Sequence, residues 1–140
     1  MRQRHAPTAP AAEVLNELRG NLLNLHRILL DSERSLYERD VAKIEGPGHF
    51  LGLLMNDPWF AYLRELSGLV VHIDEAIDGA EQPLTLDDAI ALVRRAEELL
   101  RPAENGTGFG ARYYEAMQRD PGVVLAHAAT AKALAGLRAR

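Results

Sequence analysis

Cysteine is absent from the 140 residues of this chain, which excludes disulfides, zinc–thiolate sites, iron–sulfur clusters and a cysteine nucleophile. Long apolar runs are absent as well, because no window approaches the roughly 20 apolar residues that a membrane-spanning helix needs. The beginning, MRQRHAPTAPAA, is basic but has no apolar run behind it, so we do not expect it to be a secretory signal. These absences predict a soluble, cytoplasmic protein without a membrane partner.

An excess of basic residues is also missing, since the formal net charge is -4. Binding to nucleic acid requires a basic face that displaces counterions, so we expect no nucleic-acid partner. The content of 47% hydrophobic and 26% charged residues is ordinary for a globular protein, and the length suits one domain. We predict a flexible tail over residues 1–10 and a single helical domain over residues 11–140.

Alternating, β-branched segments bounded by turns, which would indicate strands, are not found. Apolar residues instead recur every three or four positions, which is typical of amphipathic helices. The prediction is an all-α fold, a helical bundle of four main helices with two short connecting helices. The main helices are expected at about 11–44, 58–78, 86–100 and 121–137, and the short ones at about 48–55 and 111–119. The leucine stripe of the first helix comprises Leu15, Leu18, Leu22, Leu25, Leu29 and Leu36.

The only tryptophan, Trp59, directly follows the pair Asp57-Pro58. Proline suits the first turn of a helix, where its missing N–H would have no partner, so Trp59 is expected to head the stripe of the second main helix. We interpret it as the residue that closes one end of the core, with a ligand-binding surface as the alternative. Phe60 and Tyr62 fall off this stripe and are predicted to be more exposed. The last helix is predicted to bury Val124, Ala128, Ala131 and either Leu134 or Ala135.

A second stripe on the first helix consists of His26, Leu30, Glu33 and Tyr37. An imidazole, a carboxylate and a phenol on one helical face can form a proton relay or line a polar pocket. The alternative is a boundary row that meets solvent or a partner. His127 stands where the last helix expects an apolar residue, either as a buried neutral histidine or as an axial haem ligand.

A metal site and a catalytic site are not predicted. A di-iron bundle needs Glu-x-x-His pairs on two helices, and the chain has none. None of the serines within the helical patterns lies in a nucleophile elbow. The sequence therefore favours a protein that is not an enzyme and that needs no cofactor.

The segment NGTGFGARYY contains three alternating glycines before a short helix. It lacks the Gly-Lys-Ser/Thr ending of a phosphate loop, and no strand precedes it. Gly108, Gly110 and Arg112 are candidates for holding an anion at the start of that helix. The alternative is a flexible connector in which Phe109 fills the core.

Three stretches, LLDSERSLYERD, NDPWFAYLRELSGLVVHIDE and GFGARYYEAMQRDPGVVLAH, resemble a family of small, all-helical bacterial proteins of uncharacterised function. The resemblance implies the fold and a bacterial origin but no activity. Two hypotheses follow from the residues. The first is a non-enzymatic interaction or regulatory protein that forms a homodimer through the second stripe. The alternative is a bundle that binds a small molecule in a pocket between helices. The pocket residues would be His26, Glu33, Tyr37, Trp59 and His127.

Overall fold

The computed structural model describes residues 3–140, and the all-α class predicted from the sequence is confirmed. Within these residues no strand is present, and the only β-type pairing is an isolated bridge between His5 and Ala80. Four helices are long and two are short, and one 3-10 turn follows the first short helix. The elements are α1 (Ala9–Asp40), α2 (Pro47–Asn56), η1 (Pro58–Phe60), α3 (Leu63–Asp78), α4 (Leu86–Leu99), α5 (Phe109–Arg119) and α6 (Pro121–Arg138).

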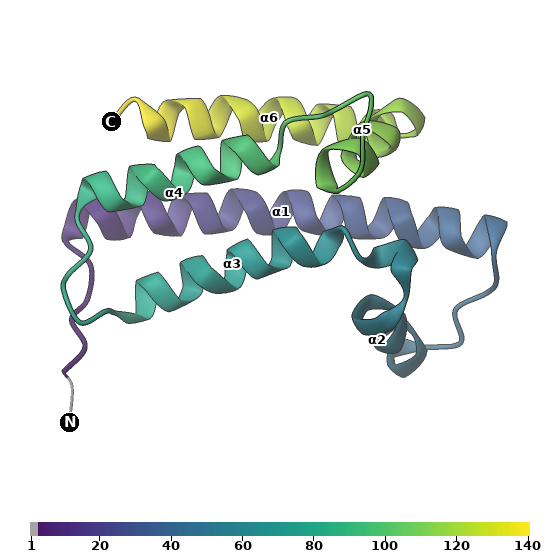
Figure 1. Cartoon of the computed structure of the whole chain (residues 1–140), viewed down its shortest axis with the longest axis horizontal. Helices are drawn as coiled ribbons and strands as arrows, with labels where there is room; N and C mark the ends of the chain where they lie inside the picture. Colours follow the sequence, from purple (N-terminus) through teal and green to yellow (C-terminus); the bar gives the residue numbers. More distant parts are fainter. Residues whose placement is uncertain (1–2) are drawn as a thin grey trace.

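Helix α1 is the central element, and α3, α4 and α6 all pack along it (Figure 1). Its 32 residues span about 48 Å, so one helix supplies a face to each of its neighbours. Leu15, Leu18, Leu22, Leu25 and Leu29 are fully buried, which confirms the predicted stripe as far as Leu29, whereas its last member, Leu36, is only half-buried. Helix α4 also packs on α6, and the short α5 packs on α6 near the far end of α1.

The segment before α1 differs from the predicted tail. Thr8 caps α1, which begins at Ala9, and the backbone of His5 pairs with that of Ala80 at 2.7 and 3.0 Å. The N–H of Thr8 donates to the carbonyl of Leu84 at 3.0 Å. Residues 3–8 therefore lie along the connection between α3 and α4, while residues 1 and 2 of the predicted tail lie outside the described residues.

The predicted helix from Pro58 is interrupted. Asp57 accepts a hydrogen bond from the N–H of Trp59 at 2.8 Å and starts the 3-10 turn η1, after which α3 begins at Leu63. A 3-10 turn has three residues per turn rather than 3.6, so it rotates the side chains that follow. Phe60 is 0% and Tyr62 5% exposed. The prediction that these two aromatic side chains would be more exposed was wrong.

Helix α6 buries a different face from the predicted one. The buried residues are Val123, Ala126, Thr130, Leu134 and Leu137, whereas Val124 is 41% exposed. Ala128 and Ala131 are also exposed, so of the predicted set Leu134 alone is buried. The reason is local: the segment VVLAHAATAKALAGL is small and apolar on nearly every side, and such a pattern does not fix which face is buried.

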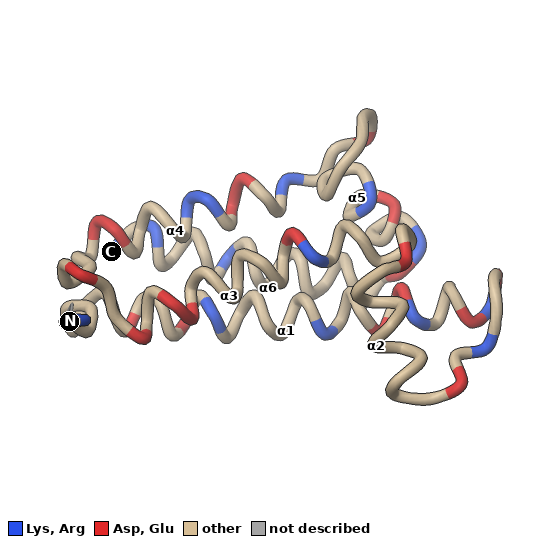
Figure 2. The backbone as a smooth tube through the Cα atoms, turned by 60° about the horizontal axis from the view of Figure 1, so that its bottom comes forward, with Lys and Arg blue, Asp and Glu red and all other residues tan. Residues whose placement is uncertain are grey.

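Helix α2 lies to the side of the long helices, near the C-terminal end of α1 (Figure 1). None of its residues is buried. Figure 2 shows it as a segment without Lys, Arg, Asp or Glu, in contrast to the charged stretches that flank it. An uncharged helix with no buried residue is an unusual surface for a chain with 26% charged residues.

Candidate functional site

The carboxylate of Glu33 on α1 is 0% exposed and contacts side chains from the N-cap of α3 and from α5. The hydroxyl of Tyr62 donates to its Oε2 at 2.5 Å, and Nη2 of Arg119 donates to the same oxygen at 2.7 Å. Nη2 of Arg112 lies 4.0 Å from Oε1. We call Glu33, Tyr62, Arg112 and Arg119 the Glu33 cluster. It fastens α5 to the interior face of α1, because a buried charge is tolerated only when it is paired.

The phenol of Tyr62 acts as a donor in this cluster. Its burial, followed by the negative charge of Glu33 and the hydrogen bond to it, raises the pKa of Tyr62 far above the ordinary value of 10.0. The hydroxyl therefore keeps its proton and points it at Glu33. The guanidinium of Arg112 also lies over the Tyr62 ring, 5.1 Å from its centroid, which adds a cation–π contact to the ionic one.

Tyr37 and Trp59, two other predicted pocket residues, contact each other beside this cluster. Their rings meet edge to face with centroids 5.6 Å apart, and Tyr37 also packs on Phe60 at 5.6 Å. Nη2 of Arg112 donates to the carbonyl of Trp59 at 3.3 Å. Trp59 is half-buried and packs against the core, but its Nε1 and the Oε1 of Glu33 are buried without a hydrogen-bond partner. The structure thus brings Glu33, Tyr37 and Trp59 together at one end of the fold.

His26 does not join them. It lies two turns before Glu33 on α1 and is half-buried, and within residues 3–140 no hydrogen bond connects its ring to Glu33 or Tyr37. The relay geometry that the second stripe suggests is therefore not assembled in this conformation. Burial lowers the pKa of His26 below its ordinary value, which favours the neutral imidazole.

The residues of the predicted anion site are arranged differently from what the sequence led us to expect. Gly108 precedes α5 with a φ of 91°, and it lines with Arg112 a depression of about 430 Å³. Glu115 lines the same depression and pairs with Nε of Arg112 at 3.3 Å. Gly110 serves packing instead, since a Cβ there would stand 2.7 Å from the carbonyl oxygen of Arg101. Phe109 is 4% exposed, as the alternative interpretation of this segment requires.

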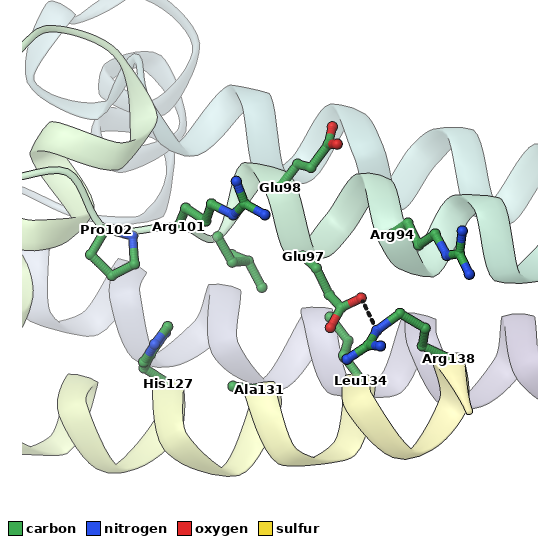
Figure 3. A pocket seen from close by; sticks show the side chains of 10 residues that line it. Arg94, Glu97, Glu98, Arg101, Pro102, His127, Ala131, Leu134 and Arg138 are labelled. Atoms are coloured by element: carbon green, nitrogen blue, oxygen red, sulfur yellow. Dashed lines mark hydrogen bonds and ion pairs between the residues drawn. The ribbon is translucent and has the colours of Figure 1, made fainter. Parts of the chain in front are cut away.

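His127 lies apart from the Glu33 cluster, on the face of α6 that looks toward α4 (Figure 3). Its Nδ1 is 2.7 Å from the hydroxyl of Tyr113, a side chain that is 0% exposed. It also lines a cavity of about 470 Å³ between the two helices. His127, one of the five predicted pocket residues, lines this cavity together with Arg94, Glu97, Arg101 and Arg138.

The charged residues of this α4–α6 cavity were missed from the sequence, although a signal was present. Arg94, Glu97, Glu98 and Arg101 follow the steps i, i+3, i+4 and i+7, which place them on one face of a helix. Such a face usually meets solvent. Only the position of α6 across from it turns this charged row into the wall of a cavity.

Another groove runs between α3 and α4. It consists of two adjoining depressions of about 760 and 720 Å³, both lined by His72, Glu75 and Arg95. Its rim carries both signs of charge. Within residues 3–140 no group of three or more His, Asp or Glu side chains is arranged to hold a metal ion, and no helix there is long and apolar enough to span a bilayer.

Acidification is expected to destabilise the fold through His26 and His127. Burial lowers the pKa of both imidazoles below the ordinary 6.5, so the unfolded chain takes up a proton at a higher pH than the folded chain. Their contribution to stability is complete above pH 6.5 and is lost as the pH falls toward the folded-state values. Urea unfolding at about pH 7.5 and about pH 5 measures this loss. An equally large loss in the double variant His26→Gln/His127→Gln would contradict this assignment.

Comparisons with protein-family models, with curated proteins and with solved structures find no match for this chain. The resemblance to small helical bacterial proteins therefore stays a prediction.

Proposed function

We propose that this chain is a non-enzymatic interaction protein that forms a homodimer through helix α2. The observation that carries the proposal is the outer face of α2, where Leu51 is 57% and Met55 63% exposed. Val41, 55% exposed, stands shortly before this helix in the chain. Exposed apolar side chains that occur singly need no explanation, but a group of them on one uncharged helix is typical of an interaction surface.

Helix α2 has two distinct faces. Phe50, Leu53 and Leu54 are partly buried and pack against the core, and the steps between them place them on one side. Leu51 and Met55 lie on the opposite side together with Gly48 and Gly52, all four of them exposed. The inner face holds α2 in position, so the outer face is presented on a fixed helix.

A second copy of the same helix is the partner that fits this face. Two large side chains alternate with two glycines, so the large residues of one copy can enter the gaps left by the glycines of the other about a twofold axis. The face has no charge, and two identical copies therefore meet without repulsion. Gly52 costs helix stability of up to about 1 kcal/mol relative to alanine. Beyond the helix's own backbone and the neighbouring residues, no atom of residues 3–140 stands within 4 Å of the position of a Cβ there, so packing within the described residues does not require this glycine.

The second stripe of α1, which the sequence suggested as the dimer interface, offers a partner less surface than α2, because two of its four residues are buried. Glu33 is 0% and Tyr37 8% exposed, and both are covered by residues of the same chain. The proposal therefore keeps the homodimer but moves its interface to α2. The charged side chains of the Glu33 cluster are paired with each other, which is the arrangement of a structural element.

The molar mass in solution tests the proposal. We expect the 15.5 kDa chain to approach twice its mass with a dissociation constant of about 1–100 µM, since a single short helix forms a small interface. The variant Leu51→Glu should be monomeric over the same range, because each interface would bury two unpaired carboxylates. Val71→Glu is the matched control, as Val71 is 54% exposed on α3.

Gly52→Ala separates dimerisation from folding. Alanine favours the helix by up to about 1 kcal/mol and meets open space in the monomer, so the variant should unfold at the same or a higher urea concentration. Its methyl group fills the gap for the partner, and dimer affinity should fall. Sedimentation equilibrium measures the mass and urea unfolding the stability. A monomer at about 1 mM, or a Leu51→Glu variant that still dimerises, would overturn the proposal.

A further inference from the structure

We infer that the α4–α6 cavity is a binding site for a small organic acid, with a carboxylate held by His127 and Arg101 and an apolar body on the floor. The inference is independent of the dimer proposal, because it rests on other helices. Its starting point is the contact between Tyr113 and His127, since this contact decides which ring nitrogen of His127 carries the hydrogen.

The hydroxyl of Tyr113 is buried, and its hydrogen-bond partner is Nδ1 of His127 at 2.7 Å. Burial raises the pKa of Tyr113 well above 10.0, so the phenol is protonated, and its proton is best placed on the bond to Nδ1. Nδ1 is then an acceptor. Burial also lowers the pKa of His127, and the neutral ring must carry its hydrogen on Nε2. The fold thus makes Nε2 of His127 a hydrogen-bond donor on the wall of the cavity.

The charges around this donor favour one negative charge. Three arginines and two glutamates line the cavity, Arg94, Arg101, Arg138, Glu97 and Glu98, which leaves a net charge of +1 in a chain of net charge -4. Glu97 accepts a hydrogen bond from Nε of Arg138 at 2.9 Å across the two helices (Figure 3). Within residues 3–140 the guanidinium groups of Arg94 and Arg101 have no hydrogen-bond or ion-pair partner.

The size and floor of the cavity specify the rest of the ligand. A volume of about 470 Å³ lies in the range of small-molecule sites, which combine apolar walls with a few polar groups. Leu100 and Leu134, 5% and 1% exposed, line it together with Pro102. In Figure 3 the side chain of His127 extends toward Pro102 and Arg101 at the end of α4. A carboxylate matches a guanidinium and an N–H donor, whereas the two glutamates disfavour a doubly charged phosphate.

Titration with hexanoate, monitored by the ring signals of ¹⁵N-labelled His127 in NMR spectra, tests the inference. We expect the Nε2–H tautomer before any addition, and saturation with a dissociation constant of about 1 mM for so small a probe. The neutral analogue 1-hexanol should bind about tenfold more weakly, because it cannot form the charge-assisted hydrogen bonds. Inorganic phosphate should bind more weakly than hexanoate too.

Arg101→Met keeps the apolar stem and removes the charge, and it should weaken hexanoate about tenfold. Arg95→Met is the matched control, because Arg95 lies on α4 but lines the α3–α4 groove. An Nδ1–H tautomer, equal binding of hexanol or phosphate, no saturation by about 20 mM hexanoate, or unchanged affinity in Arg101→Met would each overturn the inference. Arg101 is exposed, so its replacement tests the site without disturbing the core.

Discussion

Replacing Glu33 with alanine is expected to lower the free energy of unfolding by about 3–5 kcal/mol. The carboxylate is 0% exposed, and its removal leaves the Arg119 guanidinium and the Tyr62 hydroxyl without their acceptor at the junction of α1 and α5. The loss of stability therefore comes from donors left without an acceptor as well as from a small void. Urea unfolding followed by helical circular dichroism measures the difference.

Glu38→Ala is the matched control on the same helix. Glu38 pairs with Arg34 at 3.4 Å on the surface and accepts a hydrogen bond from the N–H of Ile44 at 3.3 Å, and these two contacts together contribute about 1–2 kcal/mol. If the Glu33 and Glu38 variants lost equal stability, the Glu33 cluster would not be the buried ionic anchor that the geometry indicates.

A double variant separates the pair from its surroundings. Arg119→Met alone removes the nearest positive charge and leaves the buried Glu33 carboxylate with the Tyr62 hydroxyl and, at 4.0 Å, Arg112, so it should cost a large part of what the loss of Glu33 costs. Glu33→Leu/Arg119→Met removes both charges, and it should recover a large part of that loss because neither charge is left unpaired. Additive losses in the double variant would mean that the two residues do not act as a pair.

The helical class and the core face of α1 follow from the sequence because they rest on local periodicity. The leucine stripe from Leu15 to Leu29 repeats at three- and four-residue steps, and no competing pattern exists there. The capping box of Thr85 and Asp88 is equally local, and both of its hydrogen bonds are present. Features of this kind depend on residues within one or two helical turns, so the sequence order already contains them.

The candidate sites depend on contacts between distant residues and follow from the sequence much less. Glu33 is separated from Tyr62 by 29 positions and from Arg119 by 86. No periodicity links these residues, so the second stripe revealed an unusual row on α1 without revealing what covers it. The tautomer of His127 likewise depends on Tyr113 on the neighbouring helix α5. The sequence predicted α2 only as a short helix, since the exposure of its outer face depends on how the chain turns after Gly46.

The exposure predicted for Phe60 from the sequence and its burial in the structure imply very different effects of a substitution on the free energy of unfolding. If Phe60 were exposed, as helical periodicity predicts, its replacement by alanine would change the free energy of unfolding by no more than about 0.5 kcal/mol. Because the ring is fully buried in the structure, we expect Phe60→Ala to lower the free energy of unfolding by about 3–5 kcal/mol. Val71→Ala is the control, because that side chain is 54% exposed on α3. Urea unfolding of both variants decides between the two positions of the ring.

The same ring connects the core to the proposed dimer surface. Phe60 packs on Tyr37 and on Phe50, whose centroid lies 5.8 Å away, and Phe50 belongs to the inner face of α2. Loss of the Phe60 ring removes the support beneath α2, so Phe60→Ala should weaken dimerisation even under conditions where the chain is still folded. Phe60→Leu retains most of the apolar volume and should keep more of both properties. A Phe60→Ala variant that dimerises normally while folded would show that α2 does not need this support.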